Sequence, residues 1–154
     1  MAIPPFQSFL DSERDTVFRF LVATVGPDEA EDAFQETFIS ALRAYPRLKP
    51  DSNLRAWVLT IAHRKALDLF RARKRRPVPV EELPEQPVAA ASPNGRSEAW
   101  TAARELPAKQ REALLFRFAA DLPYSDVAEA LGCTEEAARQ RVSEAVRNLR
   151  KVMQ

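Results

Sequence analysis

The sequence predicts an all-α protein built from two small helical domains that a proline-rich linker joins. Only three of the 154 residues are glycine, and the chain is rich in Ala, Leu, Arg and Glu, which favour helices. Apolar residues recur at helical spacing on both sides of residues 77–95, which read PVPVEELPEQPVAAASPNG. The five prolines of this segment remove backbone donors and disfavour helix in the residue before each of them. We therefore expect domains at 1–76 and 97–154 and an extended linker at 77–96.

The first domain is expected to begin with two long helices that Gly26-Pro27 separates. The first runs from Phe6 to Val25, and it would divide in two if Asp11-Ser12-Glu13 re-caps the chain. Asp28 is the expected N-cap of the second helix. The apolar stripe of this second helix consists of Ala30, Ala33, Phe34, Thr37, Phe38, Ala41, Leu42 and Tyr45.

A third helix is expected to begin near Ser52 or Asn53, after a loop that Pro46 and Pro50 bracket. Its inward side consists of Leu54, Trp57, Val58, Ile61, Ala62 and Leu69, and we expect Trp57 to pack in the core. Residues 51–76 carry a net charge of +6, whereas the whole chain carries +1. This local block predicts a polyanionic partner at one place, with an ordinary solvated helix end as the alternative.

The second domain contains a helix-turn-helix pattern. Helices are expected at Ser97–Glu105 and Ala108–Ala120, with Leu114, Leu115 and Phe118 inward. Ser125 is the expected N-cap of a helix that runs through Leu131 and ends at Gly132. Thr134 is the expected N-cap of a long helix that runs to about Met153. The inward positions of the motif are Val127, Ala128, Leu131, Ala138 and Val142.

The front of the last helix has the residue types of a DNA reader. Its exposed positions are expected to be Glu135, Glu136, Arg139, Gln140 and Ser143. In a major groove Arg reads guanine and Gln reads adenine. A plain helical hairpin without DNA-binding activity is the alternative interpretation.

Composition argues against catalytic, metal-binding and membrane functions. The single cysteine, Cys133, excludes an internal disulfide and fits a reducing cytoplasm. His63, the only histidine, has no cysteine or carboxylate at ligand spacing, so we expect no metal, no cofactor and no catalytic residues. No segment approaches the ~20 apolar residues that span a bilayer, and the first residues lack the features of a signal peptide. A soluble cytoplasmic protein is expected.

Motifs in both halves resemble the extracytoplasmic-function (ECF) group of sigma-70-type sigma factors. Leu106–Phe118 followed by the helix-turn-helix is similar to region 4, which reads the −35 promoter element. Asp28–Phe38 resembles region 2.2, and Leu54–Ala62 with Ala66–Arg71 resembles regions 2.3 and 2.4. The likeness covers nearly the whole chain in the right order. It implies a transcription initiation factor that binds core RNA polymerase, directs it to promoters and has no catalytic activity of its own.

The resemblance also implies roles for individual residues. The β′ clamp helices of the polymerase would bind Asp32, Gln35 and Glu36. The −10 element would contact a flipped-base loop and the basic helix, through Leu48, Lys49, Asn53, Arg64, Lys65, Arg71, Arg73, Lys74, Arg75 and Arg76. The −35 element would contact Thr134, Glu136, Arg139, Gln140, Arg141 and Ser143.

The first implied partner is core RNA polymerase, which would be contacted at its β′ clamp helices and its β flap. The others are promoter double-stranded DNA and the non-template single strand. The sequence neither requires nor excludes an anti-sigma factor. No membrane partner is implied, and the protein should be a monomer when free.

The sequence departs from the family pattern at two places. His63-Arg64 stands where Arg-Asn is frequent, and Ala137, Glu144 and Val146 stand where Thr and two Arg are usual. Fewer phosphate contacts should weaken −35 binding and flatten its salt dependence. Two alternatives stay open: a stand-alone helix-turn-helix regulator, and a degenerate sigma-like protein that titrates polymerase or an anti-sigma factor.

Overall fold

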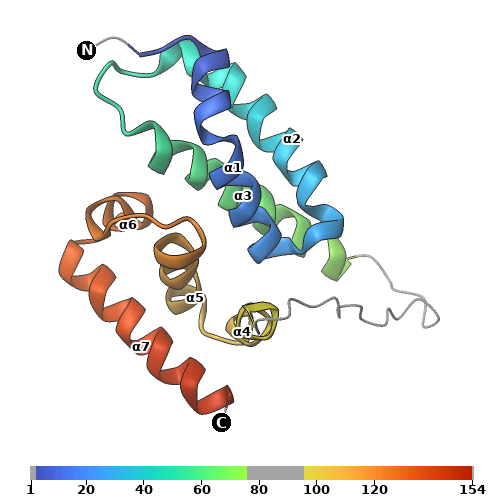
Figure 1. The fold of residues 1–154 in the computed structure, drawn as a ribbon, viewed down its shortest axis with the longest axis vertical. Helices are drawn as coiled ribbons and strands as arrows, with labels where there is room; N and C mark the ends of the chain where they lie inside the picture. The colour runs from blue at the N-terminus through green and yellow to red at the C-terminus, as the bar shows by residue number, and fades with distance from the viewer. Residues whose placement is uncertain (1–2, 76–95, 154) are drawn as a thin grey trace.

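In the computed structural model, which describes residues 3–75 and 96–153, the chain is helical and the described residues form no strand (Figure 1). The all-α prediction is confirmed. The elements are α1 (Phe6–Val25), α2 (Pro27–Ala44), the short 3-10 helix η1 (Tyr45–Arg47), α3 (Leu54–Arg75), α4 (Arg96–Ala103), α5 (Ala108–Leu114), the π-helical turn η3 (Leu115–Ala119), α6 (Tyr124–Leu131) and α7 (Glu135–Met153). Apart from Arg96, the predicted linker lies outside the described residues.

The turn between α1 and α2 depends on a glycine rather than on an aspartate cap. Gly26 has φ +92°, and its carbonyl accepts a hydrogen bond from the Ala30 amide. Pro27, which has no amide to satisfy and a φ suited to a helix, occupies the first helical position. The prediction that Asp28 caps α2 is therefore wrong, because the helix has already begun at that residue.

The possible division of α1 at Asp11-Ser12-Glu13 is not observed. The Ser12 hydroxyl donates to the Phe9 carbonyl within a continuous helix.

Aromatic rings fill the space among the first three helices. Phe9, at 2% exposure, lies within 6.2 Å, centroid to centroid, of the rings of Phe38, Tyr45 and Trp57. Trp57 therefore packs against the core, as its place in the stripe predicts. Leu42 was expected to face inward but is 54% exposed. One residue is about 100° of helix rotation, so Phe38 and Ala41 face the core while Leu42 turns to the outside.

The second half departs from the expected geometry within the helix before the helix-turn-helix. Residues 108–120 do not form one regular helix, because the chain widens to a π-helical turn over Leu115–Ala119. Side chains inside this turn do not follow the 3.6-residue period, and Phe118 is 51% exposed instead of inward. The α6 helix starts directly after Pro123, so Ser125 is inside the helix and not its cap.

The predicted turn and second cap of the helix-turn-helix are confirmed. Gly132 ends α6 in the left-handed conformation, with φ +71°. The Thr134 hydroxyl accepts a hydrogen bond from the Ala137 amide at 3.0 Å and so caps α7. Val127, Ala128, Ala138 and Val142 are buried as expected, and Leu131 is half-buried.

The two halves of the described chain, residues 3–75 and 96–153, pack against each other. One hydrophobic cluster runs from Phe20 of α1 to Phe116 of η3 and to Val127 and Ala128 of α6. Figure 1 shows α6 beside the start of α3, and the α5 and η3 segment between α7 and the first three helices. The arrangement brings the helix-turn-helix beside the loop that precedes α3.

Candidate polymerase and nucleic-acid interfaces

The outer side of α2 presents an acidic, polar surface. Asp32, Gln35 and Glu36 are exposed, whereas Ala33 and Thr37 of the same helix are buried. Asp32 and Glu36 also line a hollow of about 220 Å³ with Ala33 and with Lys65, Asp68 and Leu69 of α3. The predicted polymerase-facing residues therefore lie together, and they adjoin Lys65 of the predicted promoter-facing set.

Two apolar side chains extend the same face of α2. Ile39 is 45% and Leu42 is 54% exposed, four and seven residues after Gln35, which places them on one side of the helix. Sequence reasoning did not include them in the site. The signal was present as the spacing of Gln35, Ile39 and Leu42, but Leu42 also fitted the inward stripe.

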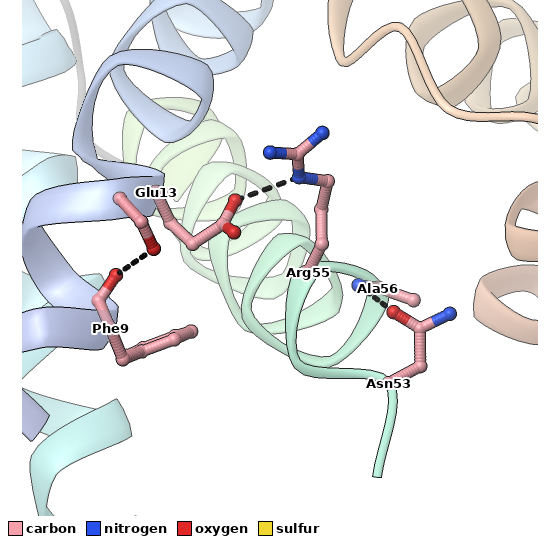
Figure 2. A network of polar contacts seen from close by, with 6 residues as sticks. Phe9, Glu13, Asn53, Arg55 and Ala56 are labelled. Carbon is pink, nitrogen blue, oxygen red and sulfur yellow. Dashed lines mark hydrogen bonds and ion pairs between the residues drawn. The ribbon is translucent and has the colours of Figure 1, made fainter. Parts of the chain in front are cut away.

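The start of α3 is fixed by two side-chain interactions, which Figure 2 shows together. Asn53 caps the helix, because its side-chain oxygen accepts a hydrogen bond from the Ala56 amide at 3.1 Å. Arg55 Nε donates to Glu13 Oε1 at 2.8 Å, and the side chain of Glu13 belongs to α1 and is nearly buried. The contact of Arg55 with Glu13 ties the start of α3 to α1.

The Asn53 amide also reaches the second half of the chain. Its Nδ2 donates to Asp126 Oδ1 of α6 at 2.7 Å. A second hollow, of about 210 Å³, adjoins this contact and is lined by Ser52, Asn53, Ala56, Trp57 and Thr60 and by Glu129 and Ala130 of α6. Of the loop residues predicted to contact DNA, Lys49 is exposed and Leu48 is half-buried.

The positive residues of α3 are spread along the helix. Arg64 is exposed, Lys65 is half-buried, and exposed Arg71 lies 3.8 Å from Asp68 of the same helix. The backbone of Arg73, Lys74 and Arg75 continues α3, but their side chains and Arg76 lie outside the described residues.

His63, which sequence reasoning left without a carboxylate neighbour, has one in the structure. Its Nε2 lies 3.1 Å from Glu112 Oε2 of α5, and its ring contacts Phe116 with centroids 5.5 Å apart. The contact with His63 holds the pKa of the Glu112 carboxyl below its ordinary value of 4.5, although burial acts in the opposite direction. The two residues are 49 positions apart, so no spacing rule could find the pair.

The front of α7 presents most of the residues predicted to read the −35 element. Glu136, Arg139, Gln140 and Ser143 are exposed. Gln140 Nε2 donates to Glu144 Oε2 at 3.2 Å, and Arg139 forms a 3.7 Å ion pair with Glu135. Arg141 is different, because it is half-buried and its charge helps to lower the pKa of the Glu112 carboxyl.

Two residues beside Arg139 were missed by sequence reasoning. The Arg139 guanidinium lies 4.6 Å from the centroid of the Tyr124 ring, and the Arg117 guanidinium lies 4.7 Å from the same ring. Arg117 also donates to the Leu122 carbonyl at 2.9 Å. Arg117 belongs to η3, and only the fold brings it to the recognition helix.

Within residues 3–75 and 96–153, no three His, Cys, Asp or Glu side chains are grouped so as to hold a metal ion. The same residues include no helix with the length and apolar character that crossing a bilayer requires.

Comparison with protein families identifies both halves. The chain matches the family model of sigma-70 region 2 over residues 9–76 and that of sigma-70 region 4 over residues 96–149. It is 31% identical over 144 residues to the ECF RNA polymerase sigma factor SigC of Mycobacterium tuberculosis, a match that covers 90% of this chain and 78% of the relative. It is 34% identical over 155 residues to SigD of the same species, covering 92% and 73%.

Solved structures show a similar arrangement of the two halves. The sigma factor RpoE of Bartonella quintana, in complex with the anti-sigma factor NepR, superposes with a TM-score of 0.71 at 27% identity, covering 96% of this chain and 97% of that one. Residues 3–75 or residues 96–153 alone are too small a share of the chain to give a TM-score of 0.71. Both halves of RpoE therefore superpose on this chain together. CnrH, in complex with the cytosolic domain of CnrY, gives a TM-score of 0.73 at 20% identity and covers 96% and 86%, which supports the fold.

Proposed function

Since the chain belongs to the ECF group of sigma-70 factors and directs the initiation of transcription by RNA polymerase, we propose which of its surfaces performs each task. The α2 face with Asp32, Gln35 and Glu36 binds the β′ clamp helices of core polymerase. The exposed carboxylates of this face and the apolar side chains of Ile39 and Leu42 beside them support the proposal, because interfaces combine an apolar centre with a polar rim.

The two DNA-facing surfaces divide the promoter between them. The loop at Leu48 and Lys49, with Asn53 and the positive side of α3, takes the −10 element and its non-template strand. The front of α7, with Arg139 and Gln140, reads the −35 element. The observation that carries this assignment is the exposure of Glu136, Arg139, Gln140 and Ser143 on one side of a capped second helix, which is the geometry of a major-groove reader.

Three further properties belong to the proposal. The chain acts without catalytic activity of its own, in the cytoplasm, and as a monomer when free. An anti-sigma factor is proposed as a further partner, because the RpoE structure that shares the arrangement of both halves contains one. A stand-alone helix-turn-helix regulator is disfavoured, because residues 9–76 match sigma-70 region 2.

Promoter-dependent transcription with purified core polymerase tests the proposed function. The wild-type chain should give transcripts from its own promoter, and the double variant Asp32→Arg/Glu36→Arg should lose both core binding and transcripts. Asp15→Arg/Glu105→Arg makes the same charge change at exposed positions outside α2 and should keep both activities. Core binding without transcripts by the wild type would favour the titrating factor, and equal loss in both double variants would reject the assignment of the α2 face.

A further inference from the structure

Two arginines from different elements meet at the ring of Tyr124. Tyr124 is the first residue of α6, directly after Pro123, and its side chain is half-buried. The Arg139 guanidinium of α7 lies 4.6 Å from the ring centroid, and the Arg117 guanidinium of η3 lies 4.7 Å from it. Both distances are within the ~6 Å over which the face of an aromatic ring attracts a cation. The proposed function assigns a task to Arg139 alone among these three residues.

Arg117 is the anchored member of the group. Its side chain is half-buried, and its Nη1 donates to the Leu122 carbonyl at 2.9 Å. Its guanidinium also lies 5.7 Å from the centroid of the Phe118 ring. These contacts restrict the position of Arg117, so Arg117 in turn restricts where the Tyr124 ring can lie.

Arg139 is the loosely held member. Its side chain is 59% exposed, and its ion pair with Glu135 is 3.7 Å long, beyond the ~2.7–3.2 Å of an N–H···O hydrogen bond. An arginine side chain in solvent samples many rotamers and loses this freedom when it binds. The contact with the Tyr124 ring selects among these rotamers before DNA arrives, which lowers the entropic cost of binding.

The contact with the ring is compatible with the reading of a base by Arg139. A guanidinium is planar, so it stacks on a ring with its face and donates hydrogen bonds within its plane. The O6 and N7 atoms of guanine accept a pair of such bonds in the major groove. A phosphate contact positions the protein without carrying sequence information. The orientation of Arg139 therefore matters for base reading more than for phosphate binding.

We propose that Tyr124 is a specificity-determining positioning residue, whose ring holds the Arg139 guanidinium with its edge toward a base of the −35 element. Arg117 of η3 fixes the ring in this place. The inference rests on the proposed reading of the −35 element by Arg139. The attraction of a cation to a ring at an exposed site corresponds to about a two- to fivefold change in affinity, and this is the effect expected on discrimination.

Holoenzyme binding to two duplexes tests the inference. One duplex is selected by the wild-type holoenzyme from a library randomised at the −35 element, and the other carries a scrambled version of the selected element. Tyr124→Leu should lower the ratio of the two affinities about two- to fivefold, whereas Tyr124→Phe, which keeps the ring, should retain it. Phe118→Leu makes the same kind of change at a nearby exposed ring and should also retain it.

A double-mutant cycle tests whether the ring acts through the arginine. Tyr124→Leu/Arg139→Ala should discriminate no worse than Arg139→Ala alone, because without Arg139 the ring has nothing to position. In the free full-length chain, the Nε–Hε resonance that Arg139→Ala removes should be shifted by the ring current in wild type and Tyr124→Phe. It should move toward its random-coil position in Tyr124→Leu.

Three outcomes would overturn the inference. Additive losses in the cycle would mean that Tyr124 acts independently of Arg139. A loss in Tyr124→Phe that is equal on both duplexes would assign the hydroxyl to a phosphate instead. Loss of discrimination in Arg139→Ala with none in Tyr124→Leu would overturn this inference alone and leave the proposed function intact. Full discrimination by Arg139→Ala would instead reject the proposed reading of the −35 element by that residue, and this inference with it.

Discussion

The two halves of the chain bury their side chains in different ways. Residues 3–75 enclose a set of large rings among α1, α2 and α3, including Phe9, Phe38 and Trp57. Residues 96–153 have a small cluster of their own, made of Ala103, Leu106, Leu114 and Ala145 with Trp100, Val146 and Leu149 against it. The larger buried side chains of this half, such as Phe116 and Leu122, join the cluster of the first half.

This difference identifies the half that depends more on the contact between the halves. A buried Phe or Leu side chain contributes roughly 1.5–3 kcal/mol relative to its exposed form. The first half keeps most of its ring cluster when the halves separate, whereas the second half exposes the side of Phe116 that Phe20 covers. A partner that separates the halves must therefore compensate for the exposed apolar surface of the second half more than for that of the first.

The largest expected effect tests the self-sufficient core of the first half. Phe9→Ala should lower the free energy of unfolding by about 3–5 kcal/mol, because the Phe9 ring is enclosed by other rings and its loss leaves a cavity. Urea titration followed by circular dichroism measures the change. Phe18→Ala, on the same helix but 40% exposed, is the matched control and should cost less than about 1 kcal/mol.

The second prediction compares the DNA contacts of the two halves. Arg139→Ala should reduce discrimination between the matched −35 element and a scrambled one by about 1–3 kcal/mol, if Arg139 contacts a base edge. Arg71→Ala in the first half should weaken holoenzyme binding on every promoter alike and reduce the salt slope of log affinity by about 0.7–0.9. Titrations of holoenzyme with both promoters at several salt concentrations measure the two effects. A uniform loss in Arg139→Ala would assign that residue to the phosphates.

Local patterns predicted the elements, but not the places where distant segments meet. Helix periodicity and the Thr134 cap sufficed for the helices and for the exposed front of α7. Phe118 was misplaced because a π-helical turn cannot be read from a 3.6-residue period. The pairs His63–Glu112 and Asn53–Asp126 join residues 49 and 73 positions apart, and no local signal encodes such contacts. The same limit hid the neighbourhood of Arg117, Tyr124 and Arg139.

The third prediction measures how strongly the halves are coupled. A double-mutant cycle with Phe20→Leu and Phe116→Leu should give an interaction energy of about 0.5–1.5 kcal/mol, the range for a stacked aromatic pair beyond its buried area. A control cycle pairs Phe20→Leu with Leu149→Ala, because Leu149 packs in the separate cluster of the second half. This control should be additive to within the error of the urea titrations. Additivity in the first cycle would mean that the halves unfold independently.

The smallest expected effect comes from pH, through Glu112 at the edge of the same contact. Glu112 faces His63 of α3, Arg111 of its own helix and Arg141 of α7, and these groups lower the pKa of its carboxyl from the ordinary 4.5. A carboxyl with a lowered pKa stabilises the folded form above its unfolded pKa, and this contribution is lost as pH falls through the folded value. The free energy of unfolding of wild type should therefore exceed that of Glu112→Gln above about pH 4.5, by less than about 1 kcal/mol because the carboxylate is partly exposed to solvent. The difference should shrink toward zero as the pH falls through the lowered pKa of the Glu112 carboxyl. Glu105→Gln, at an exposed position, should show no such dependence. A difference between wild type and Glu112→Gln that persists at low pH would mean that the shape of the side chain, and not its charge, holds α5 against α3.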